Sequence, residues 1–293
     1  MFSGRPLANR FITCFSGLPA RLRMVQYRCP RKGRQAPSGN DDRPFPDKGA
    51  AVIESREITI TTVFDNYPFA EGLKTLWGFS CYIETPRKTL LFDTGSNGRV
   101  LLENMQKLGT RVEKADTLFL SHHHWDHIGG LDSVIERNTS LEIIAPSSLS
   151  KLLIRDLESM GHRVITVGEE AFAFSDGFYT TGMMGGELRE HSLVIDTEAG
   201  LIVVTGCAHS GIVAIAQRAQ AMRGKKIDLL LGGFHLMHEG EAAVRRAIEA
   251  LQAMGVNRVC PTHCSGDTAK RLFRDAFAER CIEGGAGRVG KRS

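Results

Sequence analysis

Five short apolar segments of this 293-residue chain are each followed by a polar or metal-binding residue. Segments of this length, rich in Leu, Ile, Val and Phe, are typical of buried β-strands. The residues that follow them are Asp93, the histidine cluster at 122–127, Cys207 with His209, His235 and His263. Strand ends gather at one edge of a sheet, where side chains that are far apart in the sequence can meet. The chain is therefore predicted to fold around a sheet with one functional edge.

The order of strand and helix patterns predicts an α/β protein with two packed sheets. Residues 56–93 alternate as strands, in "REITITTVFDN", "GFSCYIET" and "TLLFDTG". Later apolar strands include "TLFLS", "LEIIAP", "RVITVG", "GFYTTG" and "SLVIDT". Helical patterns lie between them at 97–109, 148–160, 211–223, 240–254 and 267–280. Strand-rich segments followed by more frequent helices favour two sheets face to face with helices outside.

The net charge of +4 comes from the N-terminal end of the chain. The first 40 residues hold eight of the 37 Lys and Arg residues and none of the 33 Asp and Glu residues. Residues 1–50 are compatible with an organelle-targeting segment, a disordered basic extension, or an over-called start with Met24 as the initiator. We exclude them from the fold and expect one domain at 51–282. The Gly-rich residues 283–293 are expected to form a flexible tail.

Composition narrows the classes of function. The chain beyond residue 40 has 29 basic and 33 acidic residues, so it offers no electrostatic support for a nucleic-acid partner. No apolar run reaches the roughly 18 residues that a membrane span needs. Seven cysteines without regular spacing do not form a disulfide framework, which favours a reducing compartment. We expect a cytoplasmic protein, with organelle import through the basic N-terminus as the alternative.

The segment "FLSHHHWDHIGG" concentrates metal-binding side chains in one loop. His122 and His124 are two residues apart, so an extended loop can direct both imidazoles toward one ion. Asp126 and His127 lie around the turn and can face a second ion. Zinc, iron and manganese all accept such nitrogen and oxygen ligands. The alternative is a His-rich surface loop that binds nothing, and His123 is expected to be a bystander that points into the fold.

Several segments together resemble the metallo-β-lactamase superfamily of metal-dependent hydrolases. They are "VFDN", "WGFSCYIET", "LLFDTG", "LSHHHWDHIGGL", "VVTGCAHSGI", "GGFHL" and "THCSG", which span about 57 to 267. The branch that the chain resembles is called dihydropterin ribofuranosyl-aminobenzene phosphate synthase-like. The resemblance implies an αββα sandwich of two mixed sheets with outer helices and with metals at one edge.

The resemblance also assigns roles to individual residues. It places His122, His124, Asp126 and His127 in the metal motif, and His263 in the late ligand position. A buried structural histidine is the alternative for His263.

Asp93 matches a supporting aspartate that accepts an N–H from a ligand histidine or from the loop backbone. A turn-capping role is the alternative for Asp93.

The middle ligands depart from the common superfamily pattern. Many members carry "TGD" after a strand, and that aspartate bridges two metals. Here the equivalent segment is "VVTGCAHSG", so Cys207 stands in the bridging position and either binds as a thiolate or only lines the site. His209 is expected to supply the missing imidazole ligand, and His191 is its rival.

The remaining histidines and the tryptophans receive weaker assignments. His235 follows a strand and is expected to contact substrate or act as an acid; capping the strand end is the alternative. His238 and His162 are expected at the surface. Trp77 and Trp125 flank the predicted site loops and are compatible with a pocket wall or with the core.

The implied activity is metal-assisted hydrolysis of a small molecule. One or two divalent ions, zinc first and iron or manganese as alternatives, would be held by the candidate ligands, with Asp126 and His235 as catalytic groups. Ester-type and phosphoester-type substrates fit, pterin-linked phosphates among them. A di-iron redox enzyme and a non-catalytic metal-binding protein are the competing classes. We expect no nucleic-acid or membrane partner, and the sequence does not indicate an oligomeric state.

Overall fold

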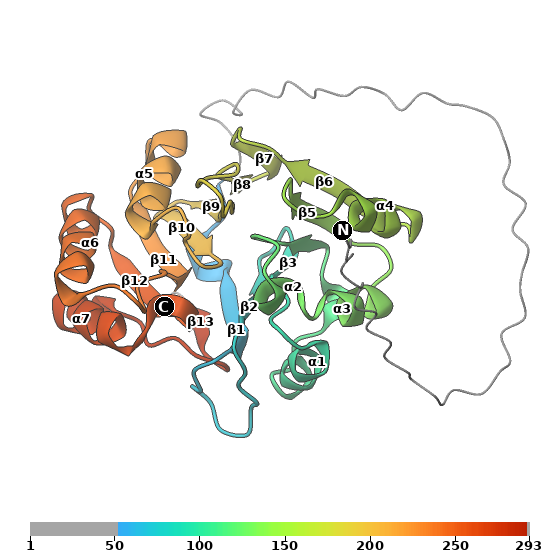
Figure 1. The fold of residues 1–293 in the computed structure, drawn as a ribbon, viewed down its shortest axis with the longest axis horizontal. Coiled ribbons are helices and arrows are strands. Elements are labelled where there is room, and N and C mark those ends of the chain that lie inside the picture. Colours follow the sequence, from blue (N-terminus) through green and yellow to red (C-terminus); the bar gives the residue numbers. More distant parts are fainter. Residues whose placement is uncertain (1–51, 292–293) are drawn as a thin grey trace, which may run out of the picture. The chain divides into compact units, whose positions relative to one another are not determined.

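The computed structural model describes residues 52–291, which form two β-sheets packed face to face with helices on the outside (Figure 1). The expectations for the basic N-terminal extension at 1–50 lie outside the described residues. Four layers result, in the order helices, sheet, sheet, helices. The predicted αββα architecture is confirmed.

The first sheet has seven strands in the order β13-β1-β2-β3-β4-β5-β6. Strands β13, β1, β2 and β3 pair antiparallel, whereas β3, β4, β5 and β6 run parallel. The strands are β1 (Thr59–Asp65), β2 (Phe79–Glu84), β3 (Thr89–Phe92), β4 (Thr117–Phe119), β5 (Glu142–Pro146), β6 (Arg163–Val167) and β13 (Val289–Lys291).

The second sheet has six strands in the order β12-β11-β10-β9-β8-β7. Strands β10, β11 and β12 run parallel, and the remaining neighbours pair antiparallel. The strands are β7 (Phe172–Ser175), β8 (Phe178–Thr180), β9 (Leu193–Thr197), β10 (Gly200–Thr205), β11 (Ile227–Gly233) and β12 (Arg258–Thr262).

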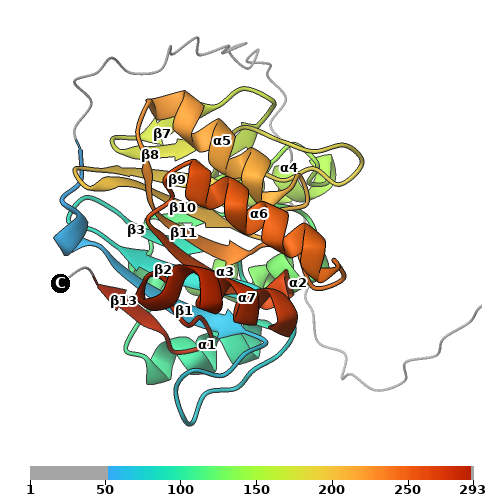
Figure 2. The ribbon, with the colours of Figure 1, turned by 90° about the vertical axis from the view of Figure 1, so that its left-hand side faces the viewer.

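Helices cover the outer face of each sheet. Figure 2 shows α5, α6 and α7 lying across the six-stranded sheet, and Figure 1 places α1, α3 and α4 on the opposite side of the molecule. The helices are α1 (Gly98–Lys107), α2 (Trp125–Ile128), α3 (Leu131–Arg137), α4 (Lys151–Ser159), α5 (Ile212–Arg223), α6 (Glu241–Ala253) and α7 (Asp267–Phe277). Short 3-10 turns occupy Ser55–Glu57, Val112–Lys114, His263–Ser265 and Ala278–Arg280. The five helices expected from periodicity are all present, each within a few residues of its predicted bounds.

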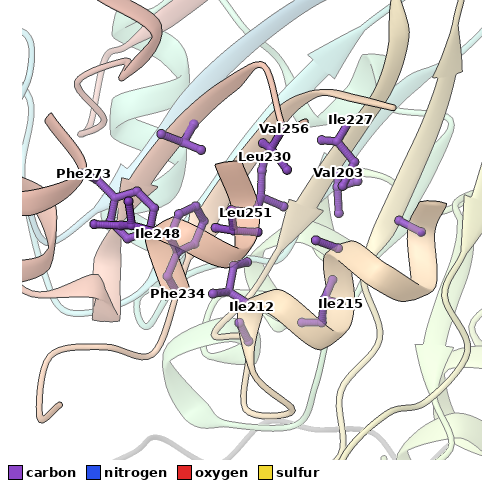
Figure 3. Packing of buried hydrophobic residues seen from close by; sticks show 14 of the residues in the cluster. Val203, Ile212, Ile215, Ile227, Leu230, Phe234, Ile248, Leu251, Val256 and Phe273 are labelled. Carbon is purple, nitrogen blue, oxygen red and sulfur yellow. The ribbon is translucent and has the colours of Figure 1, made fainter. Parts of the chain in front are cut away.

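Alternation along the buried strands divides the core between layers. On β10, Leu201 and Val203 pack under the helices, while Ile202 and Val204 face the other sheet. Because helices cover one face of β10 and the other sheet covers its second face, nearly all of its residues are apolar. Figure 3 shows the outer layer, where Val203 of β10, Ile212 of α5 and Leu251 of α6 belong to one cluster of buried side chains.

The C-terminal segment corrects the expectation of a flexible tail at 283–293. Val289–Lys291 form β13, which pairs with β1. Ala286 is buried, and its backbone exchanges hydrogen bonds with Tyr67 and Phe69. The glycines were misleading: Gly285 has φ 148°, and a Cβ there would lie 3.0 Å from the Pro68 backbone, so glycine permits this close packing. Strand β7 was also missed.

Within residues 52–291, no helix combines the length and the apolar character needed to cross a membrane.

Candidate metal centre

The carboxyl ends of β3, β4, β10, β11 and β12 meet at one edge of the sandwich. This follows from the parallel pairing of β3 with β4 and of β10 with β11 and β12. The predicted site residues therefore converge, although they come from segments more than 100 residues apart. Their potential ligand atoms form three groups that share members, and within each group all ligand atoms lie within 4.8 Å of one another. The groups are His122, His124 and His209; Asp126, His127, Cys207 and His263; and Cys207, His209 and His235.

Sharp backbone reversals follow these strands. Asp93, Ala208, His235 and His263 have φ of 53°, 61°, 54° and 49°. Such left-handed values are uncommon for residues other than glycine, and they cluster at functional sites. Four of the five non-glycine residues with positive φ in the described chain lie at this edge. The chain turns abruptly there and directs side chains into the site.

The first group consists of three imidazoles without an acidic residue. The Nε2 atoms of His122 and His209 are buried and have no hydrogen-bond partner within residues 52–291. Burial, followed by neighbouring imidazoles, lowers the pKa of His209 to about 4 and the pKa of His122 well below its ordinary value. Burial also lowers the pKa of His124. All three side chains are therefore neutral, as metal ligation requires.

The second group combines a carboxylate, two imidazoles and a thiol. His127 Nε2 lies 3.2 Å from Cys207 Sγ, and His263 Nε2 lies 3.4 Å from the same sulfur. Asp126 Oδ2 is 3.3 Å from His263 Nε2 and 3.6 Å from His127 Nε2. Burial raises the pKa of Asp126, but hydrogen bonding to His263 and the charge of His127 outweigh burial, and the pKa falls to about 2. Asp126 is thus a carboxylate at neutral pH.

Cys207 stands where the two groups meet, next to a second thiol that the sequence did not single out. Cys264 Sγ donates to the backbone oxygen of Cys207 at 3.5 Å. A Cβ at Gly233 would lie 2.7 Å from Cys264 Sγ, so glycine at the end of β11 leaves room for this thiol. Hydrogen bonding to Cys264 and burial raise the pKa of the Cys207 thiol. A coordinated cation acts in the opposite direction, because it displaces the thiol proton.

Asp93 holds the histidine loop in place, as expected. The carboxylate is fully buried and accepts hydrogen bonds from His127 Nδ1 at 2.7 Å, Ser121 N–H at 2.7 Å and Ser121 Oγ at 2.6 Å. Burial lowers the pKa of His127, but the charge of Asp93 and its hydrogen bond outweigh burial and raise the pKa. With Nδ1 donating to Asp93, Nε2 is the nitrogen that faces Cys207.

Asn66 supports His263 in a similar way, and no role was predicted for this residue. Asn66 Oδ1 lies 2.9 Å from His263 Nδ1, and Asn66 Nδ2 donates to the His263 backbone oxygen at 3.3 Å. The indole of Trp77 also packs against His263, with the two ring centroids 5.0 Å apart. The signal for Asn66 was its position directly after β1, in "VFDN".

Glu190 is a buried carboxylate that sequence reasoning missed. It accepts the backbone N–H of Ala208 at 2.7 Å and of His209 at 3.0 Å, and thereby supports the left-handed turn after β10. Burial raises its pKa to about 7 in spite of these bonds. An acid in the connection before an apolar strand carries no distinctive sequence signal.

His235 lies at the rim, where its side chain is exposed. Its ring centroid is 4.5 Å from that of His209. Hydrogen bonding to Cys264 is the largest influence on its pKa, and the net effect raises the pKa above the ordinary value for histidine. His235 therefore lies at the edge of the sheet where it was predicted.

The other histidines have separate surroundings. Both ring nitrogens of His191 are engaged, with Thr180 Oγ1 and the Leu120 backbone oxygen each at 2.8 Å, so this rival of His209 lies outside the candidate groups. His123 is exposed, which corrects the expectation that it points into the fold. His162, which follows α4 in the chain, is buried, and burial lowers its pKa, so its predicted surface position was wrong. His238 is exposed, as expected.

The donor set fits divalent cations. Two buried imidazole nitrogens of the site, those of His122 and His209, lack hydrogen-bond partners among the described residues. The surrounding ligands combine nitrogen, carboxylate oxygen and sulfur at mutual distances that one or two ions can span. Three supports, Asp93, Ser121 and Asn66, orient ligand rings from behind. The fold and this edge together define a metal-dependent hydrolase-like protein.

The comparisons with known proteins agree with this class. The family model for the β-lactamase superfamily domain matches residues 88–264, and the chain belongs to this superfamily. A solved metal-dependent hydrolase of the superfamily has a TM-score of 0.67 at 24% identity, covering 80% of this chain and 99% of that one. Human tRNase Z, short form, has a TM-score of 0.54 at 14% identity, with 80% and 98% covered. Both likenesses concern the fold.

Two curated relatives are similar in sequence over most of the chain. The 7,8-dihydropterin-6-methyl-4-(beta-D-ribofuranosyl)-aminobenzene-5'-phosphate synthase of Methanocaldococcus jannaschii is 28% identical, covering 76% of this chain and 92% of the relative. A UPF0173 metal-dependent hydrolase of Bacillus velezensis is 26% identical, with 71% and 90% covered. The predicted resemblance to the superfamily and to this branch is confirmed.

Proposed function

We propose that this chain is a metal-dependent hydrolase that cleaves an ester-type or phosphoester-type bond in a small molecule. The observation that supports this proposal is the convergence of two ligand groups from three strand ends, those of β4, β10 and β12. One group consists only of neutral imidazoles, and the other adds a carboxylate and a thiol.

Each group is assigned one divalent cation. His122, His124 and His209 would hold the first ion, and Asp126, His127, Cys207 and His263 the second. We assign zinc to the site, because it accepts imidazole and thiolate together, whereas magnesium and calcium prefer oxygen ligands. Because Cys207 replaces the bridging carboxylate common in relatives, we do not favour the di-iron redox alternative.

When bound, the cation supplies Lewis-acid chemistry, which makes water acidic near pH 7 and polarises the bond under attack. Asp126 remains ionised, since its pKa is about 2, so it can accept a hydrogen bond from the attacking water and orient it. His235 is exposed at the rim with a raised pKa, so it can donate a proton to the leaving group. Asp93 and Asn66 keep the Nε2 atoms of His127 and His263 facing the site.

The finer assignment of substrate rests on a relative and on charge. The Methanocaldococcus jannaschii relative is named as the synthase of a pterin-linked phosphate, which supports compounds of that chemical class as ligands of this site and as one substrate class to test. Beyond residue 40 the chain has more acidic than basic residues, which disfavours nucleic acid as a substrate.

The test pairs neighbouring histidines in one loop. His122→Ala should lower bound metal by at least one ion per chain and abolish turnover on a panel of phosphoesters, thioesters and lactones. His123→Ala is the matched control, because His123 is exposed and contacts only Ser148 Oγ, at 3.2 Å, among the hydrogen bonds described. Metal content is measured by inductively coupled plasma mass spectrometry. Turnover by metal-free protein, or full metal binding without turnover on any substrate of the panel, contradicts the proposal.

A further inference from the structure

The only two tryptophans of the chain are exposed at the rim of the metal centre. As whole residues, Trp77 is 39% exposed and Trp125 is 63% exposed. Tryptophan is usually highly buried, since it is the largest apolar side chain. Leu76, next to Trp77, is exposed as well. An exposed apolar group of this kind beside a candidate catalytic centre requires an explanation.

Both indoles stand on segments that touch at the site. A Cβ at Gly78 would lie 2.4 Å from the backbone oxygen of Asp126, so the two segments approach as closely as glycine allows. Trp77 precedes Gly78, and Trp125 precedes Asp126. The Trp77 ring lies 5.0 Å from the His263 ring, while Trp125 stands between two candidate ligands in the chain.

The loop that carries Trp77 is held by the rest of the fold. Ala286 accepts the N–H groups of Phe69 and Ala70 through its backbone oxygen, at 3.0 Å each. The fully buried Asn104 accepts the Lys74 N–H at 2.9 Å and donates to the Lys74 oxygen at 2.8 Å. The segment that the sequence suggested was a tail thus anchors this loop. The indole of Trp77 is presented on a fixed support, which lowers the entropic cost of binding.

We propose that Trp77 and Trp125 are specificity-determining residues that select substrates with an aryl or heteroaryl group next to the bond that is cleaved. An indole offers a flat apolar face, and stacking of a planar ring on it adds to the energy of apolar burial. The site would hold the anionic or ester group, and the indoles would hold the ring. This inference rests on the proposed function for the reacting bond, but ring binding itself needs no turnover.

The chain offers a direct probe, since its tryptophan fluorescence comes only from these two residues. Metal-loaded, full-length protein is titrated with phenylphosphonate and, as the matched control, methylphosphonate; neither compound is an ester. Phenylphosphonate should bind about 10-fold more tightly by calorimetry and should shift the tryptophan emission. Trp77→Ala and Trp125→Ala should each reduce that preference, the ratio of the two affinities within one variant, to about threefold or less. Trp77→Phe and Trp125→Phe should retain most of it.

The outcomes separate this inference from the proposed function. Equal affinity for the two phosphonates, or no binding of either, overturns the inference, as does an unchanged preference in both alanine variants. If the tryptophan emission shifts with protein concentration and not with phenylphosphonate concentration, the indoles form an interface between two copies of the chain. That result also overturns the inference. If the unaltered protein turns over no substrate of the panel but still binds phenylphosphonate more tightly than methylphosphonate, only the proposed function is overturned.

Discussion

Replacing Asp93 with asparagine is expected to weaken metal binding about 10- to 100-fold and to lower the free energy of unfolding by about 1–3 kcal/mol. The substitution keeps the size and shape of the side chain but removes its charge. Asp93 is fully buried and accepts three hydrogen bonds, two from Ser121 and one from His127. The amide can accept on one side only, so at least one of these donors must lose its partner.

The effect on metal binding follows from the tautomer of His127. Asp93 Oδ2 accepts from both Ser121 Oγ and His127 Nδ1, whereas Oδ1 accepts the Ser121 N–H. If the amide oxygen stays on the Ser121 N–H, its NH₂ group faces His127 Nδ1. That nitrogen must then accept, which moves the ring proton to Nε2, the atom that faces Cys207. A protonated Nε2 cannot bind a cation, and a 10- to 100-fold loss corresponds to about 1.4–2.7 kcal/mol.

The assay combines two measurements on the same protein. Zinc affinity is measured by competition with a chromogenic chelator, and stability by urea unfolding of the metal-free protein. Asp196→Asn is the matched control: Asp196 is also buried, but it pairs with Arg223 and Lys225 at the opposite end of β10. The control should lose stability and keep its zinc affinity. Zinc affinity within twofold of the unaltered protein in Asp93→Asn would refute the reasoning.

Two further substitutions test other parts of the site. Cys207→Ser should lower the metal content by up to one ion per chain while the imidazole group keeps its own, because only the second group loses a sulfur; unchanged stoichiometry and affinity would show that the thiol merely lines the site. Burial lowers the pKa of His191 from 6.5 to about 3. As the pH falls, the unfolded chain therefore takes up a proton at this residue before the folded chain does. Its contribution to the free energy of unfolding is complete above pH 6.5 and is lost as the pH falls toward 3. Between pH 6.5 and 5 this loss is about 1.7 kcal/mol, and urea unfolding of metal-free His191→Gln should show a pH dependence that is shallower by that amount; parallel curves would contradict it.

The sequence was informative where chemistry followed directly after a strand. Asp93, Cys207, His235 and His263 could be assigned to one edge because parallel strands place their carboxyl ends together. The outer helices followed from their periodicity, and the αββα layers from the order of the elements. These features are local, or they follow from pairing rules that hold for any such sheet.

The supports behind the ligands were not predictable in the same way. Glu190 accepts hydrogen bonds from the N–H groups of Ala208 and His209, which are 18 residues or more away in the sequence. Asn66 is hydrogen-bonded to His263, which is 197 residues away. Neither residue type is unusual in its sequence context, and only the folded chain brings the partners together. Strand β13 was missed for a related reason, since glycines indicate a loose end unless the packing that needs them is known.

Strained backbone and buried polar contacts coincide at the metal edge, and this coupling has a consequence for stability. A left-handed conformation costs a residue with a Cβ roughly 1–2 kcal/mol. Asp93, Ala208 and His263 adopt it, and each is held by a buried or partly buried polar contact: with Ser121, with Glu190 and with Asn66. A hydrogen bond to a charged group, as at Asp93, contributes about 1.5–3 kcal/mol, and one between neutral groups, as between Asn66 and the His263 backbone, about 0.5–1.5 kcal/mol, so each is comparable to the cost of its turn. Loss of a support should therefore release its turn locally, displacing the ligand at that strand end before the sheets themselves are affected.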